Sequence, residues 1–391
     1  MIRDMGTLHI HKMFRLKNAI NKITINHNYP IIPINANAKY VKYTHRSTQY
    51  KMLDSDSLFM FCSELSNDKT ENKLLPVDEK CDVFMTCFYH NKSSSDLNGS
   101  DLYSQWMSYC QGGGAAFEFY FGQSLIGEPE QSKDYDKYIE EKMKGFKLSR
   151  NKLFDYSILI KDPKSPSDYI KYPHFPFQVQ YFEQNFFDDD TYRRQIEINT
   201  KEYGMSLFEI LPYFKHSGFI QESEARLAFI NFENILSKCI NFMQKDDGTK
   251  LPYINVKFGN ADDENKPCDF VKVEKGSTLT EAVNKKISEI PFQIKNSKCP
   301  IVIPQGRDQE EVFNVVEKVV NEYNKDKSQD NKLKIICQGH LPITKITLAP
   351  TEDRVEQKKM MEIYCKSKYW LRNVEICEST IPYNTKNSNH A

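Results

Sequence analysis

The sequence predicts an α/β fold of the α+β kind, in which helices flank one mixed β-sheet. Short apolar runs of strand length recur in the first and last thirds of the chain, at 58–62 and 299–304 for example. Amphipathic segments with a helical period follow some of these runs, as in 305–325. The last third also repeats the order strand, helix, strand twice, which is typical of α/β units.

Composition indicates a globular chain without a strong overall charge. Its 391 residues include 53 basic and 53 acidic side chains, so no net field attracts nucleic acid or an anionic membrane. No run approaches the roughly 20 apolar residues that cross a bilayer, and the N-terminus lacks a secretory signal pattern. Ten cysteines are scattered without a CxxC pair, as reduced thiols usually are. We therefore expect a cytoplasmic protein with ten free thiols, no membrane contact and no bound metal.

One domain is expected from 38 to 383. Residues 1–37 hold a basic amphipathic piece and a proline-rich link, so we interpret them as a peripheral arm, and 384–391 as a polar tail. Residues from about 123 to 213 are polar and rich in Tyr and Phe, with helical stretches. We expect this segment to be a largely helical insertion between strands of the sheet.

Strands and one short helix are expected in the first third of the domain. The apolar patterns place strands at 39–47, 58–62 and 81–88 and a short helix or turn at 48–54.

A second helix is expected at 102–110. Leu102, Trp106, Tyr109 and Cys110 fall at i, i+4, i+7 and i+8, so we expect both aromatic rings to face the interior. Ser100 and Asp101 are expected to cap the helix. Gly112 to Gly114 then precede a strand, whereas phosphate loops place glycines ahead of a helix, so the triplet predicts a helix C-cap.

Two further strand–helix–strand units are expected near the C-terminus. In the helix of 305–325, Val312, Val315, Val316 and Val319 share one face. Asp308 and Glu311 have the spacing of a capping box. Gln305, Gly306 and Arg307 follow a strand and could instead form an anion-binding corner, because ligands favour the C-terminal ends of strands in such sheets.

The stretch 214–229 carries charges on alternate residues inside an apolar run. If it is one strand, Glu222, Glu224 and Arg226 lie on the same face, roughly 6.5–7 Å apart from one to the next. Facing a cleft, the two acids and the base would suit proton transfer or cation stabilisation. Facing water, they would be an ordinary charge ladder.

The order of several strings resembles the domain-of-unknown-function family numbered 2971, which is found across bacteria, often in mobile or defence-related gene neighbourhoods. The matching strings are KYVKYTHRS, LFMFC and SNDKTE, then FMTCF and QWMSYCQGGGAAFEF, then Lys215, Phe219, Glu222, Glu224 and Arg226, and finally ITKITLAP and ESTIP. They span roughly 40 to 383.

The layout of that family resembles ADP-ribosyltransferases, which implies an enzyme that uses NAD as a substrate. The resemblance implies catalytic roles for Glu222, Glu224 and Arg226. It implies that NAD is held by a second group of residues near the first two strands and the 102–110 helix, namely Tyr43, His45, Arg46, Ser63, Trp106 and Tyr109. A carboxylate would stabilise the oxocarbenium-like cation that forms when the nicotinamide–ribose bond breaks, and an aromatic ring would stack on the nicotinamide.

Two other functions are compatible with the sequence. The chain could be a non-enzymatic sensor or protein-interaction module with a protein partner in a defence operon, in which the acidic face and Trp106 are anchors of a buried polar network. It could also be a metal-dependent nuclease, which would need Asp68, Glu71, Glu222 and Glu224 to converge on magnesium. The sequence does not identify a macromolecular target.

Overall fold

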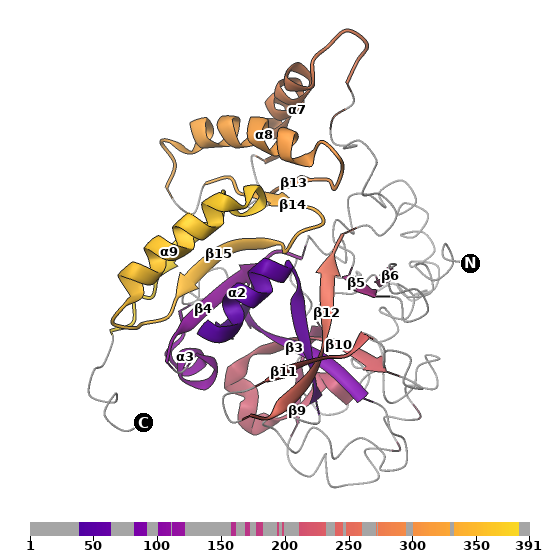
Figure 1. The fold of residues 1–391 in the computed structure, drawn as a ribbon, viewed down its shortest axis with the longest axis vertical. Helices are drawn as coiled ribbons and strands as arrows, with labels where there is room; N and C mark the ends of the chain where they lie inside the picture. The colour runs from indigo at the N-terminus through magenta and orange to yellow at the C-terminus, as the bar shows by residue number, and fades with distance from the viewer. Residues whose placement is uncertain are drawn as a thin grey trace, which may run out of the picture. The chain divides into compact units, whose positions relative to one another are not determined.

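A computed structural model gives the arrangement of the chain (Figure 1). The structure describes residues 39–63, 82–91, 101–110, 112–121, 158–161, 169–172, 177–182, 194, 198, 211–231, 239–244, 248–259, 271, 273–294, 300–328 and 332–382. The N-terminal arm and the polar tail expected at the two ends therefore lie outside the described residues.

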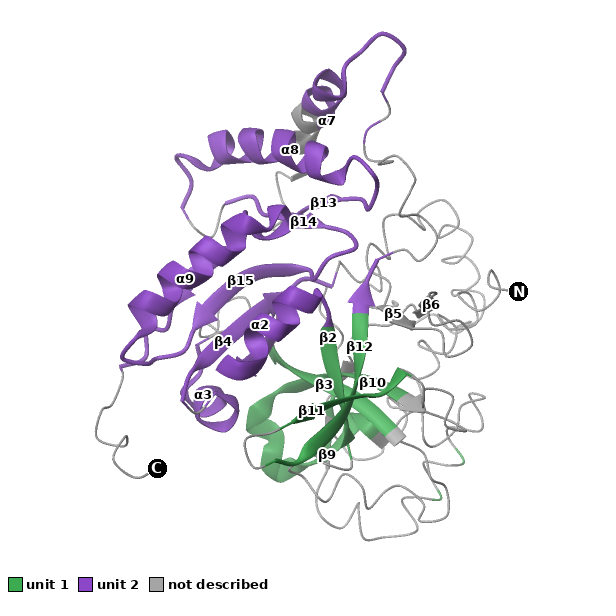
Figure 2. Ribbon diagram, viewed as in Figure 1, with its two compact units in different colours: residues 1–38, 58–90, 124–256 green, residues 39–57, 91–123, 257–391 purple. Residues whose placement is uncertain are grey.

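The chain divides into two compact units that interleave along the sequence (Figure 2). Unit 1 comprises Met1–Ala38, Leu58–His90 and Ser124–Val256, and unit 2 comprises Lys39–Ser57, Asn91–Gln123 and Lys257–Ala391. Because each unit is assembled from three separate segments, neither could be delimited by a composition boundary in the sequence. The expectation of one domain over 38–383 stays a prediction.

The predicted α/β fold is confirmed, and unit 2 illustrates it with a mixed sheet. Its strands are ordered β16 (Glu375–Glu378), β15 (Ile343–Leu348), β4 (Gly114–Phe119) and β1 (Lys39–His45). The β1–β4 and β4–β15 pairs are antiparallel, and the β15–β16 pair is parallel. All six residues of β4 are buried, so apolar layers cover both faces of this strand.

Three helices pack on the strands of the unit 2 sheet. Helix α2 (Arg46–Ser55) contacts β1 and β4, α3 (Tyr103–Tyr109) contacts β1, and α9 (Arg354–Ser367) contacts β15 and β16 (Figure 1). The unit β15–α9–β16 is one of the two strand–helix–strand units expected from the sequence.

The second expected unit is also present in unit 2. Strand β13 (Ile301–Ile303), helix α8 (Gln309–Asn324) and strand β14 (Ile335–Cys337) follow one another, and β13 pairs parallel with β14. Helix α7 (Leu279–Ile294) packs on α8.

Two details of these helices differ from expectation. The buried face of α8 contains Gln309, Val312, Phe313, Val316 and Val320, so Val315 and Val319 lie at its edge. The predicted capping box of Asp308 and Glu311 is wrong, because Asp308 makes no side-chain cap bond. A capping box does occur at α7, where Thr278 and Glu281 exchange hydrogen bonds of 2.7 and 3.2 Å.

Unit 1 has a sheet of mainly antiparallel pairs. Strand β3 (Asp82–Asn91) pairs with β2 (Leu58–Cys62) and β10 (Glu224–Asn231), and β2 also pairs with β12 (Lys250–Phe258). Strand β11 (Asn241–Gln244) adds to β12. Buried apolar side chains from these strands form the core, namely Leu58, Met60, Phe84, Phe88, Leu227 and Ile254.

The insertion expected to be largely helical contains both helical residues and strands where the structure describes it: Arg194 and Ile198 are helical, and the other described residues form mainly strands. Within 123–213 these are β5 (Ile158–Lys161), β6 (Tyr169–Tyr172), β7 (Phe177–Gln178) and β8 (Gln180–Phe182), followed by the 3-10 turn η4 (Leu211–Tyr213). Strand β5 pairs with β6, and β7 pairs with β10. For these residues the helical prediction is wrong, because pairing with neighbouring strands outweighs local propensity.

The stretch 214–229 is not one strand. It forms β9 (Phe214–His216), the 3-10 helix η5 (Ser217–Glu222) and then β10. His216 caps η5 by accepting a 3.0 Å hydrogen bond from the Gly218 amide, and Ser223 adopts a left-handed conformation with φ of 41°. Glu222 is therefore outside the strand that holds Glu224 and Arg226, and the predicted alternation of three residues fails at its first member.

The triple glycine lies between α3 and β4, but the predicted glycine C-cap is wrong, because α3 ends at Tyr109 and its C-cap is Cys110. Gly112, Gly113 and Gly114 all have positive φ. A Cβ atom on Gly114 would lie 2.2 Å from the backbone oxygen of Thr44, so only glycine fits where β4 starts beside β1.

The described segments contain free cysteine thiols and no helix suited to cross a membrane. Cys87, Cys110, Cys365 and Cys377 are free thiols, while Cys81, Cys268 and Cys299 lie outside the described residues, so the count of ten stays a prediction. Among the helices that the structure describes, none has the length and apolarity that a bilayer crossing requires.

Candidate functional site

The predicted site residues fall into two groups, one in each unit. Unit 1 holds Ser63, Glu222, Glu224 and Arg226, and unit 2 holds Tyr43, His45, Arg46, Trp106 and Tyr109. An NAD site that uses both groups, as the resemblance implies, stays a prediction.

A buried ion-pair cluster forms around Glu224 in unit 1. Glu224 and Arg226 are two residues apart on β10, so their side chains leave the same face of the strand. Lys215 comes from β9, which pairs with β8, and Glu222 from the last turn of η5. We name these four residues the Glu224 cluster.

Both carboxylate oxygens of Glu224 accept hydrogen bonds from charged side chains. Arg226 binds it at two points, with Nε 2.8 Å from Oε1 and Nη2 3.0 Å from Oε2. Lys215 Nζ lies 2.9 Å from Glu224 Oε2 and 2.8 Å from Glu222 Oε2. Arg226 Nη1 also donates to the Pro212 carbonyl at 2.8 Å. Two-point pairing of this kind is among the strongest polar contacts in proteins.

The electrostatics of the cluster keep Glu224 ionised. Burial alone would raise the pKa of its carboxyl group, since only 3% of the residue is exposed. The charges of Arg226 and Lys215, with the hydrogen bond from Arg226, outweigh burial and lower the pKa to about 2. A carboxylate with this pKa does not exchange protons near neutral pH, so it is unsuited to general acid or base catalysis.

Neighbouring residues make further contacts with the Glu224 cluster. The Glu224 amide donates to the Tyr181 hydroxyl at 2.8 Å, and the Lys215 ammonium lies 4.7 Å from the centre of the Phe219 ring. Cys87 lies opposite Arg226 on β3. Burial, followed by the charge of Glu224, raises the pKa of the Cys87 thiol, so this thiol stays protonated.

His45 and Arg46 in unit 2 have structural partners. The His45 Nδ1 accepts from the Ser47 amide at 3.3 Å, which makes His45 the N-cap of α2. The Arg46 Nη2 lies 3.0 Å from both carboxylate oxygens of Asp353. Both groups therefore contribute to the start of α2 and to its link with the start of α9.

The aromatic residues of unit 2 divide into buried and exposed ones. Trp106 is buried, and its ring meets that of Tyr43 edge to face at a centroid distance of 4.8 Å. Tyr109 is 41% exposed, so the expectation that α3 buries both rings is wrong for Tyr109. The buried face of α3 is centred on Gln105 and Trp106, and Tyr109 lies at its end.

Asp101 has a role that the sequence did not indicate. It was expected to cap α3, but the cap position is Leu102, which makes no side-chain bond. Asp101 is buried and accepts hydrogen bonds from Trp106 Nε1 at 2.9 Å, from the Thr380 amide at 2.6 Å and from the Thr380 hydroxyl at 2.7 Å, with a further bond from the Ser379 hydroxyl. One carboxylate thus joins α3 to the segment after β16. Ser100 lies outside the described residues.

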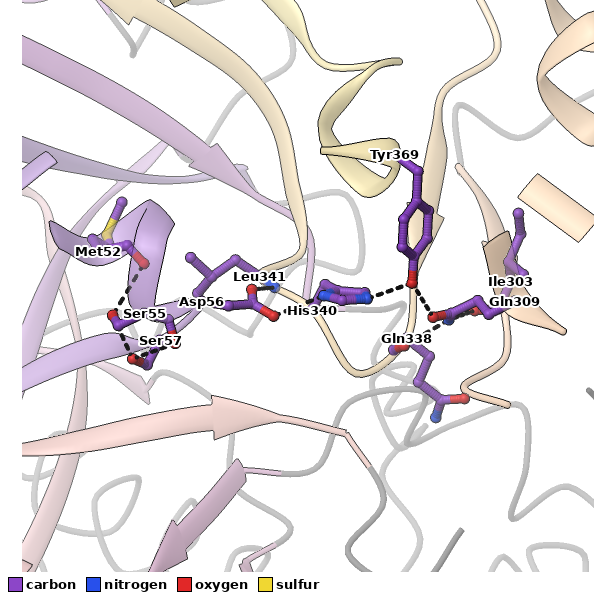
Figure 3. A network of polar contacts seen from close by, with 10 residues as sticks. All are labelled: Met52, Ser55, Asp56, Ser57, Ile303, Gln309, Gln338, His340, Leu341 and Tyr369. Carbon is purple, nitrogen blue, oxygen red and sulfur yellow. Dashed lines mark hydrogen bonds and ion pairs between the residues drawn. The ribbon is translucent and has the colours of Figure 1, made fainter. Parts of the chain in front are cut away.

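Unit 2 contains a second polar network that the sequence did not indicate (Figure 3). Asp56 at the end of α2, His340 between β14 and β15, and Tyr369 in η9 (Tyr369–Leu371) form a chain that ends at Gln309 of α8. His340 Nδ1 lies 2.7 Å from Asp56 Oδ2, and His340 Nε2 lies 2.7 Å from the Tyr369 hydroxyl. We name these four residues the His340 network.

The last member of the His340 network is held by the backbone. Gln309 Nε2 donates to the carbonyls of Ile303, Pro304 and Gln338, and Gln309 Oε1 accepts from the Tyr369 hydroxyl at 2.9 Å. The His340 ring stacks on Trp370 at a centroid distance of 5.0 Å. Each ring nitrogen of His340 thus has one side-chain partner, and the ring is packed from the side.

The remaining candidates give little support for a ligand. Ser63 is buried, and Asp68 and Glu71 lie outside the described residues. Within the part of the chain that the structure describes, no three His, Cys, Asp or Glu side chains gather as a metal site requires.

The expected anion-binding corner is held by contacts within the chain. The Gln305 amide donates to Gln338 Oε1 at 3.3 Å, and the Gly306 carbonyl accepts from the Gln309 amide at 3.1 Å. Binding of an anion at Gln305, Gly306 and Arg307 stays a prediction.

Comparison of the chain with known protein families, curated proteins and solved structures gives no significant match. The resemblance to family 2971 therefore stays a prediction, and the function must be argued from the geometry.

Proposed function

We propose that this chain is a non-catalytic protein-interaction module, of the sensor type that the sequence allows for bacterial defence systems. The observation that carries the proposal is the state of Glu224: both of its oxygens are bound by Arg226 and Lys215, and 3% of the residue is exposed. A buried carboxylate with both oxygens held by charged side chains has the contacts of a structural anchor, because removal of one partner leaves the other charge buried and unpaired.

Other charged candidates support the same conclusion. His45 caps α2 and Arg46 binds Asp353, so the two basic groups expected to hold NAD have partners inside unit 2. Glu222 shares the Lys215 ammonium with Glu224. The Lys215 contacts are those expected of anchors in a buried polar network, whereas the contacts of His45 and Arg46 are partly exposed.

The transferase hypothesis makes the opposite prediction about Glu224. If the chain uses NAD, the Glu224 carboxylate must approach the ribose, because stabilisation of the cation falls with distance. This would require the pair with Arg226 to open. The nuclease hypothesis depends on Asp68 and Glu71 as well, and stays a prediction.

The test is an NAD-consumption assay on purified wild type, Glu224→Gln and Glu311→Gln, a matched exchange at an exposed position of α8. Each protein is incubated with NAD at a temperature where all three are folded by circular dichroism. We expect no NAD loss above that of buffer from any of them. Consumption by wild type and Glu311→Gln, but not by Glu224→Gln, would overturn the proposed function in favour of the transferase.

A further inference from the structure

Helix α9 presents an apolar surface where a helix on the outside of a sheet normally presents polar residues. Met361 and Cys365 are buried against the sheet. Val355, Met360 and Ile363, on the opposite side, are 50%, 61% and 70% exposed. At about 100° per residue these three lie within an arc of roughly 140°, so they form one face. We name them the α9 face.

The ends of this face carry opposite charges. Glu356 lies in the first turn of α9 and Lys366 in the last turn, and both are exposed. In the described part of the chain neither has an ion-pair partner. Arg354 and Lys358 on the flank of the helix, by contrast, bind Glu378 at 3.7 and 3.6 Å. Glu356 and Lys366 are therefore available to a partner.

A second copy of the chain supplies the matching surface. Glu356 and Lys366 are ten residues apart, about 15 Å along the helix. When two copies of α9 run antiparallel about a two-fold axis, Glu356 of each copy lies beside Lys366 of the other, Met360 and Ile363 of both copies lie between these charge pairs, and Val355 lies just outside them. A parallel arrangement would place like charges together. The antiparallel one also opposes the two helix dipoles.

We infer that the chain self-associates by antiparallel pairing of the α9 face with that of a second copy. This inference names the partner of the interaction module, and to that extent it rests on the proposed function. Lys359 is exposed near the middle of the same face, and in this register it lies opposite Ile363 of the other copy, where its aliphatic stem can cover the apolar side chain while the ammonium group reaches solvent. The pair of helices is thus self-complementary in charge and in apolar surface.

Exchange of the two charges tests the register directly. Glu356→Lys and Lys366→Glu are prepared as separate proteins, and self-association of wild type, each variant and their equimolar mixture is measured by sedimentation equilibrium. We expect wild type to form a dimer of twice the 45.8 kDa chain mass. Each variant alone places like charges together, so we expect at least tenfold weaker dimerisation. In a mixed dimer of the two variants, opposite charges face each other again at both ends of the helix pair. We therefore expect the mixture to recover dimerisation within about threefold of wild type.

The apolar part of the face is tested with Ile363→Ser, which we also expect to weaken dimerisation at least tenfold. Circular dichroism should be unchanged in all three variants, because each position is exposed, and thermal unfolding should agree within about 0.5 kcal/mol when it is measured at a concentration where wild type is monomeric. A monomeric wild type, variants that dimerise like wild type, or a mixture that fails to recover would each overturn the inference. These outcomes are separate from the NAD assay: a monomer that does not consume NAD overturns self-pairing alone, whereas NAD consumption through Glu224 overturns the proposed function.

Discussion

Arg226 holds Glu224 through two contacts of 2.8 and 3.0 Å, although the two residues are neighbours on the same face of one strand. The long guanidinium side chain turns back along β10 and is itself anchored on the Pro212 carbonyl. Because both residues are buried, the pair is stable only while both charges and Lys215 are present. The two residues that sequence patterns favoured as catalytic are thus each other's main partners.

Removal of the Glu224 charge is expected to destabilise the protein. Glu224→Gln keeps the shape of the side chain but leaves Arg226 buried without an opposite charge, so we expect the free energy of unfolding to fall by about 3–5 kcal/mol. Urea unfolding followed by circular dichroism measures this change. Glu311→Gln, an exposed exchange, should change it by less than about 0.5 kcal/mol. A loss below about 1 kcal/mol in Glu224→Gln would contradict a structural role.

The same pair predicts a loss of stability in acid. The pKa of Glu224 is about 2 in the folded protein, against 4.5 for an ordinary glutamate, so the unfolded chain binds the proton more tightly. The stabilisation is therefore fully present above pH 4.5 and is lost as pH falls from 4.5 towards 2. It amounts to about 3 kcal/mol.

The measurement is the difference in unfolding free energy between wild type and Glu224→Gln at several pH values. We expect that difference to shrink as the pH falls from about 5 to about 3. A difference that stays constant over this range would show that Glu224 is not ionised in the folded state.

Asp101 gives a prediction for unit 2. Each of its oxygens faces at least one N–H donor, from Trp106 on one side and from the Thr380 backbone on the other. In Asp101→Asn, either orientation of the amide points its NH2 group at one of these donors. We therefore expect the free energy of unfolding to fall by about 2–3 kcal/mol. Ser379→Ala removes one hydroxyl donor and should cost about 1 kcal/mol. Urea unfolding of both variants compares them, and equal losses would contradict this role of Asp101.

The His340 network predicts a specific effect of one hydroxyl group. Tyr369→Phe removes the bridge between His340 and Gln309 and leaves Gln309 Oε1 without this donor. We expect the free energy of unfolding to fall by about 1–3 kcal/mol. Tyr323→Phe on α8 is the matched control, because Tyr323 is exposed and its ring contact with Lys327 is kept. Equal stability of both variants would contradict the hydrogen-bond chain.

Local pattern predicted the strands β1 and β2, the helices α2 and α3, and the two C-terminal strand–helix–strand units with α8 and α9, because each has a periodicity of its own, whereas α7 was not expected. It failed where backbone geometry changes within a run: Ser223 takes a left-handed conformation, and this separates Glu222 from the strand of Glu224. The shared face expected for the acids and the base is therefore present for Glu224 and Arg226 and absent for Glu222.

Contacts between distant segments could not be predicted from one sequence. His340 meets Asp56 across 284 residues, and Asp101 meets Thr380 across 279. Each of these residues is unremarkable in its own segment. Asp101 resembled a helix cap, because capping residues and buried acceptors are the same residue types.

The most direct test of the structural role of Glu224 is thermal unfolding of wild type and Glu224→Gln with and without NAD. A ligand present at about 100 times its Kd would stabilise the folded protein by about 2.7 kcal/mol. If Glu224 is an anchor of a non-catalytic module, the unfolding temperature of wild type will be the same with and without millimolar NAD. A rise with NAD in wild type that is absent in Glu224→Gln would contradict the account and place the nucleotide at Glu224.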